Sequence, residues 1–275
     1  MPPATEVEAP LAHRVDGGDA GGADLGTLLL LNGGFMSIGA WEPCVAPLAE
    51  SLRVVRCDFR GQLRTPGPAH RELADNVDDV VALLDHLGLD RVHVLGTSFG
   101  GEVALLLAAR RPERVASLVA VTVGDHATAA MAQGARDLAV VVAEILAGGD
   151  RGAFHDALVA DVYSPAWKEA NRTQLAERRR QIAAVPEAWF AALDDLLAAI
   201  AGFDVRPELA AIRCPTLVVV AGDDRVIPPE HGWAVASAVP GAFCLEHLTS
   251  GHALVAEQPD WLVARTLAFL AGSLP

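Results

Sequence analysis

The chain has 275 residues and 52% of them are hydrophobic, which is enough to bury the core of one large domain or of one domain with an insertion. Its 21 basic and 35 acidic residues give a net charge of −14, and without a long basic block to meet phosphates, nucleic acid and anionic membranes are not expected as partners. The N-terminus has no apolar segment like that of a secretory signal, and no apolar run reaches the about 18 residues that a membrane span needs. The cysteines stand far apart in the sequence. We therefore expect a cytoplasmic protein with buried, reduced thiols at Cys44, Cys57, Cys214 and Cys244.

The first 124 residues alternate between short apolar runs and amphipathic segments. The Gly- and Asp-rich residues 16–25 are predicted to form a loop or hairpin. The predicted strands are 27–31, 52–57, 92–96 and 115–123, and the predicted helices between them are 73–89 and 101–111. Strands that alternate with helices indicate βαβ units, and therefore a mostly parallel central β-sheet covered by helices on both faces.

Between about residue 125 and residue 205 the alternation stops and only helical signals remain. We predict three or four helices here, inserted as a lid over the carboxyl ends of the strands, where open α/β sheets bind their ligands. The alternative is extra helical packing without a gating role. The core then comprises 1–124 and 206–275, and the lid 125–205. The sheet resumes with predicted strands at 215–222 and 242–248 and predicted helices near 230–238 and 259–271. The predicted fold class is therefore α/β, with a mostly parallel sheet flanked by helices and an inserted helical lid.

A single serine, Ser98, stands where the strand 92–96 meets the helix that follows it. The local sequence "GTSFG" has the pattern Gly-x-Ser-x-Gly. A serine held on a tight strand-to-helix turn needs very small neighbours, and Gly96 and Gly100 meet that demand. The turn would project Ser98 at the positive end of the helix, where a developing oxyanion is stabilised. The alternative is a small residue in an ordinary turn, but the apolar strand before it and the apolar helix after it favour a nucleophile.

A serine hydroxyl is a weak nucleophile that needs a base, and the base needs an orienting acid. For a nucleophile on such a turn, the chain order should be Ser, acid, His. His252 lies in a loop after the last predicted strand, and we prefer it as the base to His247, which falls within that strand. The acid should follow the preceding strand, which offers Asp223 and Asp224. Asp125, at the end of an earlier strand, is a third candidate.

Acyl transfer also needs two backbone N–H groups aimed at the developing oxyanion. One is expected from Phe99, the residue after the nucleophile. The other should come from the loop after the strand 27–31, where Gly33 and Gly34 let the backbone approach closely. The alternative for this pair is an ordinary glycine loop.

These residues resemble the α/β-hydrolase superfamily over nearly the whole chain outside the insert, and most of all its small esterase, enol-lactonase and cofactor-free haloperoxidase branch. Members commonly carry His-Gly, with a Trp nine residues after that His. Here Asn32-Gly33 takes that place, and Trp41 stands nine residues after Asn32. The resemblance implies Gly34 as the second oxyanion donor. Asn32 in place of His leaves the backbone donor intact but changes the hydrogen bonds that brace the loop.

Two further stretches match the family in whole or in part. Members carry Asp-x-Arg-Gly-x-Gly-x-Ser after the next strand, whereas the stretch from Asp58 to Thr65 has Leu63 for the second glycine and Thr65 for the serine. The family's Asp-Arg-x-x-Pro resembles the sequence from Asp224 to Pro228, which implies Asp224, not its neighbour, as the acid.

The sequence thus predicts a serine hydrolase that cleaves carboxylic esters, either short, uncharged acyl esters or lactones, through an acyl-enzyme. The predicted triad is Ser98, Asp224 and His252, with oxyanion donors at Gly34 and Phe99. No metal or cofactor is expected, and the expected partner is a small-molecule ester; the oligomeric state stays open.

Other chemistries of the superfamily are weighed against this one. Haloalkane dehalogenases and epoxide hydrolases use Asp as nucleophile, and Ser98 argues against both. C–C bond hydrolysis or perhydrolase/haloperoxidase-type chemistry on the same triad is the alternative. A non-catalytic ligand-binding module is a third hypothesis, and its mark would be a lost triad member.

Overall fold

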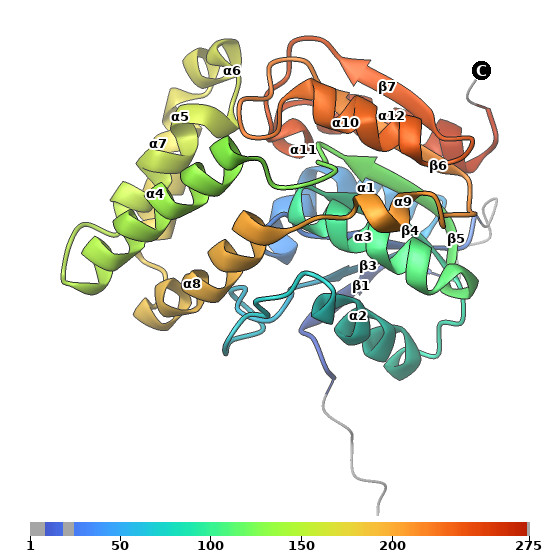
Figure 1. The fold of residues 1–275 in the computed structure, drawn as a ribbon, viewed down its shortest axis with the longest axis horizontal. Helices are drawn as coiled ribbons and strands as arrows, with labels where there is room; N and C mark the ends of the chain where they lie inside the picture. The colour runs from blue at the N-terminus through green and yellow to red at the C-terminus, as the bar shows by residue number, and fades with distance from the viewer. Residues whose placement is uncertain (1–8, 19–24, 274–275) are drawn as a thin grey trace, which may run out of the picture.

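A seven-stranded β-sheet forms the centre of the computed structural model, which describes residues 9–18 and 25–273 (Figure 1). The strand order is β1-β3-β2-β4-β5-β6-β7; β1 is antiparallel to β3, and all other neighbouring pairs are parallel. The strands are β1 (His13–Asp16), β2 (Thr27–Leu31), β3 (Arg53–Cys57), β4 (Val92–Thr97), β5 (Val115–Val121), β6 (Thr216–Ala221) and β7 (Phe243–His247). The predicted class, α/β with a mostly parallel sheet, is confirmed.

The predicted strands correspond to β2 through β7, and their ends differ by at most two residues. The sequence did not predict β1, whose four residues HRVD include a single apolar side chain. Because β1 pairs only with β3 at the edge of the sheet, it does not need a continuous apolar run. Of the predicted loop or hairpin at 16–25, Asp16 ends β1, and residues 19–24 lie outside the described residues.

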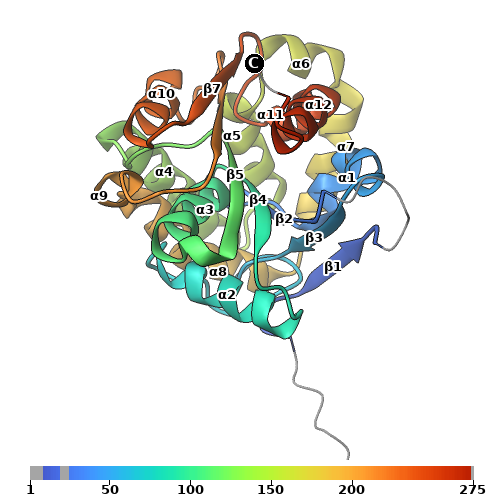
Figure 2. The same cartoon turned by 90° about the vertical axis from the view of Figure 1, so that its right-hand side faces the viewer.

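The central strands are mostly apolar because both faces of the sheet are covered. Along β2, Leu29 and Leu31 pack into one apolar layer, and Leu28 and Leu30 into the other. Figure 2 shows helices on both sides of the sheet. On the first face lie α2 (Asp75–His86), α3 (Phe99–Arg110) and α10 (Pro229–Ala238); on the second lie α1 (Glu42–Ala49) and α12 (Pro259–Leu270). Short turns of helix complete the core: η1 (Ile38–Trp41), η2 (Pro112–Arg114), α9 (Arg206–Leu209) and α11 (Leu254–Glu257).

Helix α1 was not among the predicted helices. Pro47 lies inside it, and a proline in a helix cannot donate the backbone hydrogen bond that continues the ladder. Burial of Cys44, Val45 and Leu48 against the sheet and α12 holds the segment helical all the same. Tertiary packing here overrides a local signal that disfavours helix.

Five helices of the described chain lie within residues 125–205, between β5 and α9, and they gather at one end of the sheet (Figure 1). The sequence predicted three or four. The difference arises because α6 and α7 are separated by Asn171 alone, so their helical signals merge. The five are α4 (Ala129–Leu146), α5 (Gly152–Val162), α6 (Pro165–Ala170), α7 (Arg172–Ala183) and α8 (Glu187–Gly202).

All four cysteines are free thiols, and three of them, Cys44, Cys57 and Cys214, are buried as expected. The expectation of a buried thiol is wrong for Cys244, which is exposed because it lies on the edge strand β7. Across the described residues, each helix is too short or too polar to cross a membrane.

Candidate active site

The order of the strands reverses between β2 and β4. From β2 the chain crosses to β3 on one side of it, and then to β4 on its other side. The loops that follow β2 and β4 therefore leave the carboxyl edge of the sheet side by side, which is where open α/β sheets bind ligands. Gly34 lies in the first of these loops and Ser98 in the second. The loops after β6 and β7, which reach the same edge, carry Asp224 and His252.

Ser98 occupies a strained turn between β4 and α3. Its φ of 51° and ψ of −128° are values that residues with a side chain rarely adopt. The flanking glycines make the turn possible: a Cβ on Gly96 would lie 2.3 Å from the Gly100 oxygen, and one on Gly100 would lie 2.4 Å from the Asn32 oxygen. The Gly-x-Ser-x-Gly spacing thus meets a steric requirement, and it leaves Ser98 at the amino end of α3.

The structure brings three of the predicted site residues into one hydrogen-bonded series. The Nε2 of His252 lies 3.0 Å from the Oγ of Ser98, and the Nδ1 of His252 lies 2.8 Å from the Oδ2 of Asp224. The other oxygen of Asp224 accepts hydrogen bonds from the backbone N–H groups of Val226 and Ile227, at 2.9 and 2.8 Å. Asp224 is buried, so these bonds fix a carboxylate that water scarcely reaches.

The alternative acids and the alternative base lie elsewhere. Asp223 is exposed to solvent beside Asp224. Asp125 makes hydrogen bonds with His126 and His231 and has none with His252. Among the described residues, Asp125, His126 and His231 are the one group of side chains arranged so that they could hold a metal ion. His247 stays within β7, where its ring lies 5.1 Å from that of Trp261.

The surroundings of His252 favour its charged form. Burial disfavours the imidazolium, but the charge of Asp224, the hydrogen bond to Asp224 and the charge of Glu102 outweigh it, so the pKa of His252 is raised above its usual 6.5. An imidazole with this environment accepts a proton from a neighbouring hydroxyl more readily than an isolated one.

Sequence reasoning missed Glu102, a buried carboxylic acid one helical turn after Ser98. Its Oε1 accepts a 3.0 Å hydrogen bond from the backbone N–H of Gly124. Burial, which outweighs the hydrogen bond from Gly124 and the attraction of His252, raises the pKa of Glu102 to about 7. A signal was available, because Glu102 is the one charged residue in the run GGEVALLLAA.

The two predicted oxyanion donors lie close together. As the first residue of α3, Phe99 has an N–H that no carbonyl within the helix can accept. A Cβ built on Gly34 would lie 3.8 Å from the Cβ of Phe99, so the loop after β2 runs beside the start of α3.

Side-chain hydrogen bonds from buried residues hold the Gly33-Gly34 loop in place. The amide of Asn32 accepts a 2.8 Å hydrogen bond from the Trp41 indole and donates to Asp58 and Gln62, at 2.9 and 3.0 Å. The Nε2 of Gln62 donates in turn to the carbonyls of Gly33 and Gly34, at 2.9 and 3.1 Å. Asn32 and Trp41 were singled out from the sequence; the bracing role of Gln62 was missed, because the family pattern leaves that position unspecified.

The partly matched stretch from Asp58 to Thr65 folds despite its departures. Thr65 supplies a hydroxyl where the family has serine: its Oγ1 donates to the Asp58 carbonyl at 2.8 Å and accepts from the N–H of Ala12 at 2.9 Å. Gly61 has a φ of 81°, so a glycine is needed there. Leu63 does not have a positive φ, and it is half exposed, so its backbone makes no such demand.

Helix α8 of the insert contacts the loop that carries Gly34. A Cβ on Gly34 would lie 3.1 Å from the Cδ1 of Ile200 and 3.8 Å from the Cδ2 of Leu196. These apolar side chains, which come from the far end of the insert, cover the predicted oxyanion loop.

A second contact joins the insert to the loop of His252. The buried carboxylate of Glu257 accepts hydrogen bonds from the N–H and the Oγ of Ser164, both at 2.7 Å, and from the N–H of Gly251 at 3.2 Å. Ser164 lies between α5 and α6, and Gly251 directly precedes His252. A single carboxylate therefore fixes the insert and the histidine loop relative to each other.

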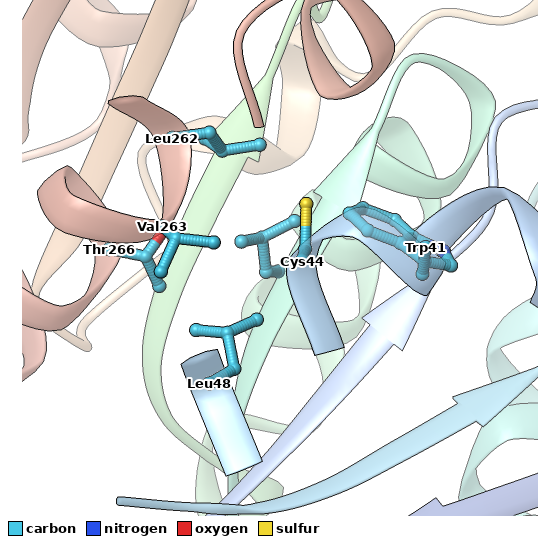
Figure 3. Close-up of a pocket in the computed structure, with 7 residues that line it drawn as sticks. Trp41, Cys44, Leu48, Leu262, Val263 and Thr266 are labelled. Atoms are coloured by element: carbon cyan, nitrogen blue, oxygen red, sulfur yellow. The ribbon is translucent and has the colours of Figure 1, made fainter. Parts of the chain in front are cut away.

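The cavity drawn in Figure 3 is a separate feature. It lies between α1, α12 and β4, on the second face of the sheet, and none of the residues of the predicted triad lines it. Its lining residues are Trp41, Cys44, Leu48, Leu95, Leu262, Val263 and Thr266. Without an ionisable group other than one buried thiol, it is a packing gap and not a reaction site.

Known proteins resemble this chain along nearly its whole length. A family model described as the alpha/beta hydrolase fold matches residues 26–259. A protein named "Putative carbamate hydrolase RutD" from Caulobacter sp. (strain K31) is 32% identical, over 95% of this chain and 96% of its own length.

Solved structures agree with that match. MGS-M2, an alpha/beta hydrolase enzyme from a Medee basin deep-sea metagenome library, has a TM-score of 0.85 at 21% identity and covers 95% of this chain and 94% of its own. The enol-lactonase from Burkholderia xenovorans LB400 has a TM-score of 0.78 at 26% identity and covers 95% of this chain and 96% of its own. The resemblance noted from the motifs is confirmed, and this chain belongs to the α/β-hydrolase fold family.

Proposed function

We propose that the protein is a serine hydrolase that cleaves carboxylic esters through an acyl-enzyme, with Ser98, His252 and Asp224 as its catalytic triad. The observation that carries the proposal is the continuous series from the Ser98 hydroxyl through His252 to Asp224, at 3.0 and 2.8 Å. Ser98 stands in a strained conformation at the start of a helix, and strain of this kind is concentrated at functional sites.

In the acylation step, the Oγ of Ser98 attacks the ester carbonyl carbon while Nε2 of His252 takes the hydroxyl proton. Asp224 holds Nδ1–H of the ring, which keeps Nε2 free to accept a proton and stabilises the imidazolium once it has formed. The C–O bond to the alcohol then breaks, and the imidazolium returns its proton to the leaving oxygen. In the second step, His252 takes a proton from water, the hydroxide attacks the acyl-enzyme, and the acid is released as Ser98 regains its proton.

We propose the backbone N–H groups of Phe99 and Gly34 as the donors to the tetrahedral oxyanion. The first N–H of a helix lies at the positive end of the helix dipole, so it favours negative charge. The close approach of Gly34 to Phe99, and the bracing of the Gly34 carbonyl by Gln62, support a fixed pair of donors. Fixed donors avoid the cost of reorganisation when charge develops.

We propose residues 125–205 as a lid over a core formed by 1–124 and 206–275. Leu196 and Ile200 of α8 contact the oxyanion loop, and Ser164 is tied to the loop of His252 through Glu257. A lid that closes this edge excludes water and bulky substrates. The free thiols also support the expectation that the protein works in the cytoplasm.

The substrate class that we propose is short, uncharged acyl esters or lactones. The side chains that approach Gly34 are apolar, which favours an uncharged acyl group over an anionic one. The enol-lactonase among the similar structures adds support for a lactone.

A second candidate is the hydrolysis of a carbamate ester. The 32% identical relative is named for that activity. The same triad would form a carbamoyl-enzyme from Ser98, and the nitrogen beside the carbonyl would make that intermediate slower to hydrolyse. The two candidates share the nucleophile and differ in the group that it receives.

The test is a panel of nitrophenyl esters from acetate to palmitate, graded lactones and a nitrophenyl N-methylcarbamate, with Ser98→Ala as the background control. We expect the highest kcat/KM on acyl chains of about two to six carbons, with a loss of roughly 1–3 kcal/mol of transition-state binding for each methylene that no longer fits. A higher kcat/KM on the carbamate would establish the second candidate. A maximum at palmitate would reject the short-chain class, and full activity in Ser98→Ala would reject the mechanism.

A further inference from the structure

Asp125, His126 and His231 form a compact cluster outside the triad. The Oδ1 of Asp125 lies 2.8 Å from the Nδ1 of His231 and 3.0 Å from the Nδ1 of His126. The three atoms that could ligate a metal all lie within 4.8 Å of one another, and all three residues are partly buried.

The cluster sits where the helical insert leaves the core. Asp125 and His126 follow β5, and the backbone there pairs with the segment that returns from α8. The N–H of Ala127 donates to the backbone carbonyl of Phe203 at 2.8 Å, and the N–H of Val205 donates to the backbone carbonyl of Asp125 at 2.9 Å. His231 comes from α10, on the core. The side chains thus join the root of the insert to a core helix.

We propose that Asp125, His126 and His231 bind one divalent transition-metal ion, of the Zn²⁺, Ni²⁺ or Co²⁺ type. Two imidazole nitrogens and one carboxylate oxygen form a common donor set for such ions. Around a tetrahedral zinc with bonds of about 2.0–2.2 Å, neighbouring ligand atoms are about 3.4 Å apart. The two distances to Asp125 are shorter than this, so the carboxylate and the rings would have to move apart to admit an ion.

The protons and charges of the cluster are compatible with a cation. Both rings face Asp125 through Nδ1, so each neutral imidazole can carry its proton on Nε2 when a metal occupies Nδ1. The guanidinium of Arg206 also interacts electrostatically with Asp125, and Asp204 holds it in an ion pair at 2.6 Å.

Such an ion would have a structural role and would not take part in the reaction of the triad. It would fasten the insert root to α10, so we expect metal to raise the melting temperature of the protein. Ester hydrolysis does not require it, because the side-chain hydrogen bonds of Asp125 go to His126 and His231, whereas His252 bonds to Ser98 and Asp224.

The experiment is a calorimetric titration of the full chain with NiCl2, in a Cys244→Ser background that removes the exposed thiol as a competing ligand. We expect one equivalent of Ni²⁺ per chain and at least tenfold weaker binding in His231→Gln and in Asp125→Asn, since even outer-shell changes weaken metal sites by about 10- to 100-fold. Two matched controls should bind as the background does. His70→Gln removes another His–Asp pair, in which the Nε2 of His70 lies 2.8 Å from Asp79, and His252→Gln removes the histidine of the triad.

Circular dichroism without metal identifies any variant that does not fold. For that case, a second measurement on the folded background protein tests whether the metal lies at this site. Anomalous diffraction from crystals of the Cys244→Ser protein grown with Ni²⁺ should show a peak between the three side chains. Failure of the background protein to bind Ni²⁺, unchanged binding in His231→Gln, loss of binding only in His252→Gln, or an anomalous peak elsewhere would each overturn the proposal and leave a purely hydrogen-bonded cluster.

Discussion

The indole Nε1 of Trp41 donates a 2.8 Å hydrogen bond to the side-chain Oδ1 of Asn32, nine residues earlier in the chain. Both side chains are fully buried. The nitrogen of the same amide donates to Asp58 and Gln62, so both polar atoms of the Asn32 side chain hold the start of the Gly33-Gly34 loop, which we propose as the oxyanion loop. This shows how asparagine braces a loop for which relatives of the family commonly use histidine.

Trp41→Phe should therefore destabilise the protein by about 1–3 kcal/mol, because it keeps an aromatic ring but leaves the Asn32 oxygen buried without a donor. Urea unfolding measures the loss. Phe269→Leu, a change of similar size in the same apolar layer, is the control for ring volume alone. If kcat falls together with stability in Trp41→Phe, the brace also positions the oxyanion loop; an unchanged free energy of unfolding would show that water replaces the indole.

Asp224→Asn should lower kcat by at least about 100-fold, because the amide no longer fixes the tautomer of His252. The backbone donors Val226 and Ile227 can still bond to the amide oxygen, so the fold should persist. Asp223→Asn is the matched control. It changes the exposed neighbour in the same way and should alter kcat by less than about threefold. The reverse ranking would identify Asp223 as the acid.

The pH profile of kcat/KM should have an acid limb with its midpoint above pH 6.5. His252 acts as a base only when neutral, and its raised pKa means that it is already protonated at a pH where an ordinary histidine is not. Rates on a nitrophenyl ester between pH 5 and 9 locate the midpoint. A rate that stays flat from pH 5 to 8 would be incompatible with a histidine base.

Glu102→Gln should move that midpoint to lower pH, because the negative charge of Glu102 helps to raise the pKa of His252. Glutamine keeps an oxygen that can accept from Gly124. The shift is read from the same assay on both proteins. A midpoint that does not move, or that moves upward, would show that Glu102 does not act on the triad.

The same substitution makes a prediction for stability. The pKa of Glu102 is about 7 in the folded protein against an ordinary 4.5, so folding favours its protonated form. That contribution is fully present below about pH 4.5 and is lost as the pH rises through about 7. Compared with the wild type, Glu102→Gln should therefore gain up to about 3 kcal/mol between pH 4.5 and pH 8. If the stability of Glu102→Gln relative to the wild type fell as the pH rose from 4.5 to 8, the raised pKa of the buried Glu102 carboxyl would be contradicted.

The sequence predicted the parts of the site that local sterics dictate. A serine between glycines at the end of an apolar strand is typical of a nucleophile on a tight turn, and the strained φ of Ser98 shows why the glycines are needed. The order of nucleophile, acid and histidine then led to Asp224 and His252. The choice of Asp224 over Asp223 came from the family pattern, since two adjacent carboxylates give no local signal of which one turns inward.

Features that depend on distant contacts were not visible in this way. Helix α1 forms although it contains Pro47, because its packing against the sheet compensates for the hydrogen bond that proline cannot donate. Strand β1 forms with one apolar residue because it pairs with one neighbouring strand only. Glu257 bonds both to Gly251 and to Ser164, which stands 93 residues before Glu257 in the chain, and no periodicity encodes such a pairing. Glu102 is different, because its charge within an apolar helix was a readable sign of a special environment.

The central claim is that Ser98 is the nucleophile, and active-site labelling tests it most directly. The protein is incubated with a fluorophosphonate, digested, and the modified residue located by mass spectrometry, with Ser98→Ala treated in parallel. We expect one adduct per chain on Ser98, together with complete loss of esterase activity, and neither labelling nor activity in a folded Ser98→Ala. An adduct on another residue, or full activity in Ser98→Ala, would contradict the proposed mechanism.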